Sequence, residues 1–203
     1  MPRLRGLCRP ARDATGRNPS FGVILHLVRH PPVAKHWQAR CYGQSDPGLS
    51  RAGQTMVGPL VAQLAALKPD VIIHSDRIRT RAIAVPLARR VGIASIAEPL
   101  WQERNFGSWE GLSWARIYRE TGNAMDGMLT APDTFCPGGG ETTSALIRRI
   151  ERALAQLPRV ARAIVIAHGG SIAGARMLLG GAGIDKSPNL IPGTGEIVSI
   201  PFD

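Results

Sequence analysis

The stretch Val23-Ile24-Leu25-His26-Leu27-Val28-Arg29-His30-Pro31 decides how the rest of this 203-residue chain is interpreted. Its mostly apolar first six residues, rich in β-branched side chains and followed by turn residues, predict a buried strand. In open α/β sheets, ligands bind just beyond the carboxyl ends of the strands, where Arg29 and His30 lie. The guanidinium of Arg29 matches phosphate oxygens, and a neutral imidazole at His30 can act as a nucleophile. From this stretch alone, two solvated polar residues at a strand end explain the pattern equally well.

A second stretch repeats this design near the other end of the chain. The run Ala163-Ile164-Val165-Ile166-Ala167 predicts another buried strand, and His168 and Gly169 lead from it into a helix that extends to about Leu179. Two histidines at strand ends, together with arginines, can converge on one anion. Further apolar runs predict strands at 70–74, 93–97 and 197–200, the last one at an edge.

An arginine near the start of a predicted helix is a second candidate anion ligand. Ser75 or Asp76, after the strand 70–74, can cap this helix, and its N-terminal amides favour an anion. Arg79 lies about one turn into the helix and can reach the same anion. Arg77 and Arg81 are expected to be surface residues.

The loop 99–111 combines two tryptophans, a phenylalanine and the carboxylates Glu103 and Glu110. Aromatic walls exclude water around a carboxyl group, which suits a general acid. A helix-entry loop with its aromatic residues in the core explains the composition equally well. The following segment, 121–137, is predicted to be an irregular flap over a site, because long loops in compact domains are commonly functional. Trp114, Met125 and Phe135 are expected to line the pocket beside it, with core packing as the alternative role for at least one of them.

Composition limits the class of protein. Residues 1–22 hold five arginines against one aspartate, which accounts for +4 of the net charge of +10, and we expect them to form a disordered basic extension before one domain at 23–203. The remaining charge is scattered, without a recognition helix or interleaved aromatic residues, so an anionic small molecule is favoured over nucleic acid as the partner. No apolar run approaches the ~18–20 residues of a membrane span. Three scattered cysteines indicate no disulfide framework, which favours the cytoplasm.

Several catalytic motifs are excluded by residue order. Ser171 lies in a turn between a strand and a helix, but no histidine follows it, as a serine hydrolase of the α/β type requires. Asp185 stands where a phosphate-binding P-loop needs glycine before Lys186. No zinc-binding helix or series of acidic ligands is present, so we expect chemistry without a metal or cofactor.

Five motifs in order then resemble the histidine phosphatase superfamily, also called phosphoglycerate-mutase-like. They cover about residues 23–200 and are Leu27-Val28-Arg29-His30, Ser75 with Arg79, the loop 100–111 with Glu103 and Trp109-Glu110-Gly111, the segment 137–141, and Ala167-His168-Gly169-Gly170. Arg29-His30-Pro31-Pro32-Val33 with Tyr42-Gly43-Gln44-Ser45-Asp46 is most similar to the α-ribazole phosphatase branch of cobalamin assembly.

The resemblance implies a three-layer α/β/α sandwich with a mainly parallel sheet. It implies that His30 becomes phosphorylated, that Arg29, Arg79 and His168 bind the phosphoryl oxygens, and that Glu103 protonates the leaving alkoxide and then activates water. Gly43, Gly169 and Trp114 are expected to complete the substrate site. The expected function is a metal-independent phosphomonoesterase for a small phosphorylated metabolite, with α-ribazole 5′-phosphate as the first candidate.

One departure leaves alternatives open. Pro31 stands where the family usually has glycine, and it has no backbone N–H to offer a ligand. A phosphate-binding module without turnover is therefore one alternative, and a phosphoglycerate-type phosphomutase is another. The domain at residues 23–203, of about 180 residues, favours a phosphatase with an open pocket over the longer mutases. The sequence does not specify the oligomeric state, and a homodimer remains open.

Overall fold

A computed structural model describes residues 22–202 of the chain. The prediction of a disordered extension at 1–22 falls almost wholly on residues 1–21, which lie outside the described residues, as does residue 203.

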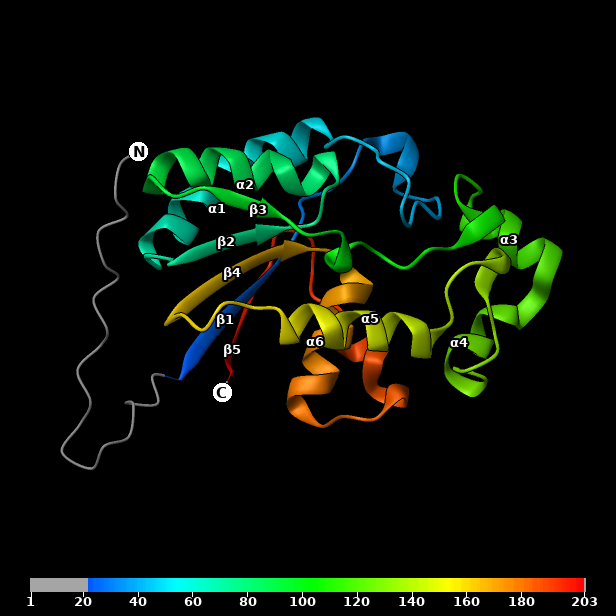
Figure 1. The fold of residues 1–203 in the computed structure, drawn as a ribbon. Coiled ribbons are helices and arrows are strands. Elements are labelled where there is room, and N and C mark those ends of the chain that lie inside the picture. The colour runs from blue at the N-terminus through cyan, green and yellow to red at the C-terminus, as the bar shows by residue number, and fades with distance from the viewer. Residues whose placement is uncertain (1–21, 203) are drawn as a thin grey trace, which may run out of the picture.

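The described residues form a mainly parallel sheet of five strands in the order β3-β2-β4-β1-β5 (Figure 1). The strands are β1 (Val23–Arg29), β2 (Val71–His74), β3 (Ser95–Ala97), β4 (Arg162–Ala167) and β5 (Ile197–Phe202). Strands β1 to β4 pair in parallel, whereas β5 pairs antiparallel with β1 at the edge. The central strands are buried on both faces, which explains their continuous apolar runs.

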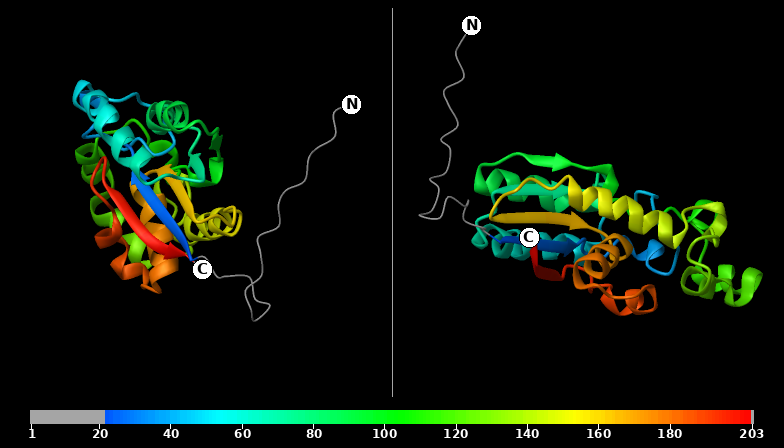
Figure 2. Two further views of the ribbon diagram at one scale, coloured as in Figure 1. Left: turned by 90° about the vertical axis from the view of Figure 1, so that its left-hand side faces the viewer. Right: turned by 60° about the horizontal axis from the view of Figure 1, so that its bottom comes forward.

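Helices cover both faces of this sheet, which confirms the predicted three-layer architecture (Figures 1 and 2). The longer helices are α1 (Arg51–Ala66), α2 (Ile78–Val91), α5 (Thr143–Ala155) and α6 (Gly169–Gly180). One core lies between the sheet and α1 with α2, around Leu64, Ile72 and Leu87. The other lies between the sheet and α5 with α6, around Leu27 and Ile150.

A smaller unit extends from the sheet beyond the carboxyl ends of its strands (Figure 1). It includes the helices α3 (Trp114–Thr121) and α4 (Gly127–Thr130), joined by a 3-10 helix at Gly122–Asp126. Its own core is formed by Cys41, Trp109 and Ile117. The prediction that 121–137 is irregular was wrong for its first half, because successive short helical turns pack there and Phe135 lies against Gly127.

The remaining short elements are 3-10 helices. They are Lys35–Trp37, Pro99–Trp101, Gly107–Trp109, Pro137–Gly139 and Ile184–Leu190. None of the helices in residues 22–202 is both long and apolar enough to span a bilayer.

Helix α2 begins differently from the sequence-based prediction. Neither Ser75 nor Asp76 is its N-cap; Arg77 occupies that position, and its side chain accepts no capping hydrogen bond. The first-turn amide of Ile78 instead donates to Asp46 Oδ1 at 2.8 Å. A carboxylate from a distant loop therefore caps α2 and joins that loop to the helix that carries Arg79.

Candidate active site

The pairing of β1 with β4 brings the two histidines of the motifs together. Arg29 pairs with Ala167 in the parallel register, so the next residue of each strand, His30 and His168, leaves the sheet at the same edge. Their ring centroids are 5.2 Å apart and their planes meet at 62°. Both side chains are buried. Residues 138 positions apart in the chain thus become neighbours because two strands end at the same level.

His30 is held as a neutral base. Its Nδ1 lies 2.8 Å from the carbonyl oxygen of Pro31. Because a carbonyl accepts only, Nδ1 carries the proton, and the lone pair lies on Nε2. Burial, followed by the positive charge of Arg79, lowers the pKa of His30 to about 3. Pro31 lacks an N–H, but its carbonyl group fixes the tautomer that a nucleophilic Nε2 requires.

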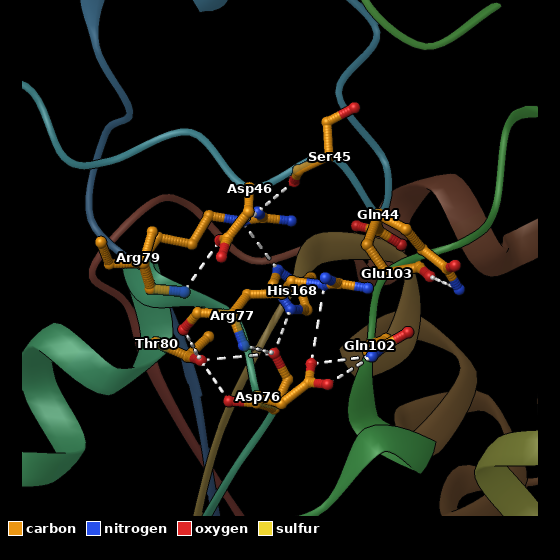
Figure 3. Close-up of polar contacts among 12 residues, drawn as sticks. Gln44, Ser45, Asp46, Asp76, Arg77, Arg79, Thr80, Gln102, Glu103 and His168 are labelled. Carbon is orange, nitrogen blue, oxygen red and sulfur yellow. Dashed lines mark hydrogen bonds and ion pairs between the residues drawn. The ribbon is translucent and has the colours of Figure 1, made fainter. Parts of the chain in front are cut away.

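The guanidinium group of Arg79 is buried, and hydrogen bonds to the loop that contains Ser45 hold it in place (Figure 3). Its Nη1 and Nη2 donate to the carbonyl oxygens of Ser45 and Gly43, each at 2.7 Å, and its Nε donates to His168 Nδ1 at 3.2 Å. The carboxylate of Asp46 lies 3.7 Å from Nη1. An arginine has five N–H donors, so two remain for an anion.

His168 has both ring nitrogens hydrogen-bonded to side chains. Since Arg79 donates to Nδ1, the proton of the neutral ring is on Nε2, which donates to Ser75 Oγ at 2.7 Å. Burial, followed by the charge of Arg79, holds the pKa of His168 well below its usual value. The structure therefore brings His168, Ser75 and Arg79 together as the motifs predicted. A direct bond from His168 to a phosphoryl oxygen requires one of the present bonds to be exchanged.

Glu103 is oriented by two backbone amides. Its Oε2 accepts from Gly170 N at 2.9 Å and its Oε1 from Arg104 N at 2.8 Å. A Cβ atom at position 170 would collide with this carboxylate, so glycine is required there for close approach. The carboxylate is thereby fixed at the start of α6, two residues after His168.

The segment before Glu103 is anchored from two sides. Gln102 Nε2 donates to both oxygens of Asp76, at 2.7 and 2.8 Å (Figure 3). Arg149 on α5 donates to the carbonyl oxygens of Leu100 and Gln102 at 2.7 and 2.8 Å. These bonds fix the backbone that carries the carboxylate without using the carboxylate itself.

A cavity of about 310 Å³ opens beside these groups. Of the predicted site residues, Arg29, Glu103 and Gly169 line it. Arg29 Nη1 donates to Pro192 O at 2.7 Å, whereas its buried Nε has no partner among the described residues. Gly169 leaves room for this guanidinium, because a Cβ there would lie 3.3 Å from Arg29 Cζ.

Two predicted substrate-binding residues lie elsewhere. Trp114 does not line the cavity; its ring packs against Phe106, which does line it, with centroids 5.7 Å apart. Gly43 also lies outside the cavity lining and serves instead through its carbonyl oxygen, which holds Arg79. Of the other two residues expected to line the pocket, Met125 lines the cavity, whereas Phe135 does not and packs beside Trp109 with ring centroids 6.2 Å apart.

Sequence reasoning assigned no role to Glu110, which organises the loop that holds Arg79. Its Oε1 accepts from Gln44 N at 2.9 Å and Phe106 N at 3.2 Å. Its Oε2 accepts from the amide and hydroxyl of Ser45 at 2.6 and 2.7 Å. The sequence singled out two glutamates in this loop, but only the fold shows that Glu110 binds the segment opposite.

Within residues 22–202, no three histidine, cysteine or acidic side chains gather as a metal site would need. The absence of a metal or cofactor remains a prediction to be tested with a chelator.

A neutral, buried histidine flanked by arginines at the carboxyl end of a mainly parallel sheet defines an α/β protein built to handle an anionic group. Residues 25–203 match the family model described as the histidine phosphatase superfamily (branch 1). The chain therefore belongs to the histidine phosphatase superfamily, and its enzyme class is phosphoric monoester hydrolase.

Individual relatives carry several names. The chain is 29% identical over 161 residues to a glucosyl-3-phosphoglycerate phosphatase of Mycobacterium tuberculosis, covering 73% of this chain and 71% of the relative. It is 28% identical over 148 residues to a probable phosphoglycerate mutase of Escherichia fergusonii, covering 71% and 69%.

Solved structures agree with this fold. A native mycobacterial glucosyl-3-phosphoglycerate phosphatase superposes with a TM-score of 0.76 at 25% identity, covering 87% of this chain and 89% of that one. The α-ribazole phosphatase of Shigella flexneri superposes with a TM-score of 0.78 at 19% identity, covering 89% and 91%, which supports the fold alone.

The neutral state of His30 predicts a specific acid sensitivity. The unfolded chain takes up a proton on this residue below its ordinary pKa of 6.5, whereas the folded chain leaves it neutral down to about pH 3. Between these values the unfolded state binds more protons, so the free energy of unfolding falls with falling pH, by up to ~1.4 kcal/mol per unit.

Urea unfolding of the wild type and His30→Asn at several pH values from 7.5 to 4.5 measures this contribution. The asparagine amide can still donate to Pro31 but does not titrate, so its loss of stability with acidification should be shallower. Parallel curves for the two proteins would contradict the assignment.

Glu110→Gln is expected to weaken both the fold and anion binding. The NH₂ of glutamine cannot accept, so one pair of donors from the loop is left unsatisfied, at a cost of about 1–3 kcal/mol in the free energy of unfolding. Because this loop holds Arg79, binding of inorganic phosphate should weaken as well. Glu151→Gln, at an exposed position of α5, is the matched control and should change neither quantity. Unchanged phosphate affinity in a destabilised Glu110→Gln protein would separate Glu110 from the site.

Proposed function

We propose that this protein hydrolyses the phosphomonoester of a small metabolite through a phosphorylated His30. The observation that carries the proposal is the state of His30: neutral, with its Nδ1 proton held by Pro31, and close to His168 and Arg79. A nucleophile in this state needs no further proton removal before attack. The family to which the chain belongs supports the same reaction class.

In the first step, His30 Nε2 attacks phosphorus and the bond from phosphorus to the leaving oxygen breaks. Arg29 and the two remaining N–H groups of Arg79 neutralise charge on the phosphoryl oxygens. In phosphoryl transfer, positioning and charge neutralisation contribute more than covalent chemistry by the protein. His168 joins this set once its bond to Ser75 or Arg79 is exchanged for one to the substrate.

Glu103 supplies and removes the protons. Its carboxyl group protonates the leaving alkoxide, and the resulting carboxylate then takes a proton from the water that attacks phosphohistidine. Water attack breaks the bond from phosphorus to Nε2, releases inorganic phosphate and restores both side chains. The amides of Gly170 and Arg104 hold the carboxylate beside the cavity where the leaving group lies.

We propose α-ribazole 5′-phosphate, and with it a role in cobalamin synthesis, as the first substrate to test. The motif around Pro31 and Pro32 supports this choice, and the fold is shared with α-ribazole phosphatases. A screen should include glucosyl-3-phosphoglycerate, since a relative is named for it. The protein is proposed to act in the cytoplasm without nucleic acid, metal or cofactor.

A phosphomutase is the second candidate, because one relative is named a probable phosphoglycerate mutase. A mutase returns the phosphoryl group to a second position of the substrate instead of to water. Following labelled phosphoglycerate distinguishes the two: release of inorganic phosphate supports the phosphatase, and positional exchange without release supports the mutase.

His30→Ala is expected to abolish hydrolysis of p-nitrophenyl phosphate, because the other imidazole of the site, His168, has both ring nitrogens hydrogen-bonded to side chains. The wild type should retain activity with a chelator present and be inhibited by vanadate, and a short reaction stopped in base should trap phosphohistidine. The matched control is His36→Ala, at an exposed position, which should remain active. Activity that requires an added divalent metal would contradict the mechanism, and phosphate binding without a trapped intermediate would favour a non-catalytic module.

Glu103→Gln is expected to reduce kcat by about 10²–10⁴ for an alkyl phosphate, the usual contribution of a placed acid. The reduction should be smaller for p-nitrophenyl phosphate, whose leaving group needs little protonation. Glu120→Gln, at an exposed position of α3, is the control. Equal losses on both substrates would show that Glu103 is not the acid.

A further inference from the structure

We propose that the cavity beside Glu103 binds the organic part of the phosphoester and that this part is an apolar alkyl or aryl body, not a polyhydroxylated one. This inference rests on the proposed phosphohistidine chemistry, because it assigns the leaving group of the same site. It ranks alkyl and aryl phosphates above α-ribazole 5′-phosphate, whose phosphate is carried by a ribose. Two observations support it: the residue types that line the cavity, and the way the lining extends away from Arg29 and Glu103 along α6.

Helix α6 gives the cavity a polar end and an apolar end. Gly169 and Gly170, at its first turn, lie against Arg29 and Glu103. Ala173 and Gly174 line the cavity one turn further, and Met177 two turns further. At 1.5 Å per residue, the face from Gly170 to Met177 extends about 10 Å away from the carboxylate. Small residues near the phosphoryl end leave room for a body lying along the helix.

The other walls beyond the reacting end are also largely apolar. Met125, Met128 and Leu129 come from the helical turns of the smaller unit, Leu146 and Ile147 from α5, and Ile191 from the segment before β5. Methionine side chains are flexible and adapt to differently shaped apolar ligands. Three separate parts of the chain thus contribute apolar side chains to the same cavity.

Few polar groups in this part of the cavity are free to bind hydroxyl groups. Thr143 already donates its hydroxyl to Met128 O at 2.7 Å. Asp126 is exposed to solvent, and Arg104 directly follows Glu103 at the reacting end. Among residues 22–202, half-buried Ser187 is the one other polar side chain that lines this part of the cavity. A sugar or glycerol body would therefore exchange its hydrogen bonds to water for contacts with carbon, which is unfavourable, whereas a methylene would gain from burial.

The test is the specificity constant, kcat/KM, for n-alkyl monophosphates from ethyl to octyl, kept below their micelle concentrations. A buried methylene is worth ~0.8 kcal/mol, so kcat/KM should rise roughly 3- to 4-fold per added carbon until the cavity is full. Glycerol phosphate and ribose 5-phosphate are the polar comparators and should be poorer than alkyl phosphates of similar size. A flat or falling series, or better turnover of the polar esters, overturns the inference.

Ala173→Leu narrows the cavity one turn from the reacting end and should lower the ratio of octyl to ethyl kcat/KM by ten-fold or more. Ala52→Leu adds the same volume at an exposed position of α1 on the opposite face of the sheet, and it should leave the ratio unchanged. If Ala173→Leu does not fold, the half-buried α5 position offers Ile147→Glu, for which the same loss of ratio is expected. Unchanged ratios in the folded cavity variant overturn the inference.

A second experiment separates failure of this inference from failure of the proposed function. If no ester is hydrolysed, the same cavity is tested with n-alkyl phosphonates, which need no turnover, by the shift in Tm at fixed concentration. A Tm that rises with chain length supports the apolar cavity although the protein is not a phosphatase. Equal shifts for all chain lengths overturn the apolar cavity.

Discussion

The parallel register of β1 and β4 is the constraint on which the site depends. Pairing of Arg29 with Ala167 places the next residues, His30 and His168, side by side at one edge. A shift of one residue would turn one imidazole toward the opposite face of the sheet, since side chains alternate along a strand. The apolar residues of both strands resist that shift, because it would move buried side chains out of the two cores.

Around these two histidines, backbone carbonyl and amide groups hold the functional side chains in place. The guanidinium of Arg79 is held by two carbonyl oxygens, the carboxylate of Glu103 by two amides, and His30 by one carbonyl. Burial, and after it the positive charge of Arg79, keeps both histidines neutral, and neutrality is what a nucleophilic nitrogen needs. Glu110 extends the arrangement outward, because it fixes the loop whose carbonyl groups hold Arg79. The same preorganisation makes the fold sensitive to acid, since neutral buried histidines oppose protonation.

In the proposed mechanism, the cavity adds selectivity to this chemistry. Its reacting end is shaped by the motifs, whereas its far end is formed by methionines and aliphatic residues outside them. Two proteins can therefore share the phosphoryl site and still act on different esters, because the leaving group contacts segments that the motifs do not include.

The sequence by itself determined the strands, the order of the motifs and the candidates for the reactive residues. An apolar run that ends in a polar residue predicts a strand with that residue at the sheet edge. Both parts of this pattern are consecutive in the chain, which is why β1, β4 and the position of His30 could be predicted. Only the tertiary structure decided that Asp46 caps α2 and that Glu110 holds the loop at Gln44 and Ser45. It also decided that Trp114 packs on Phe106, which lines the cavity, without lining it itself. Each of these contacts joins segments that the chain leaves apart, and their geometry depends on packing that no local pattern records.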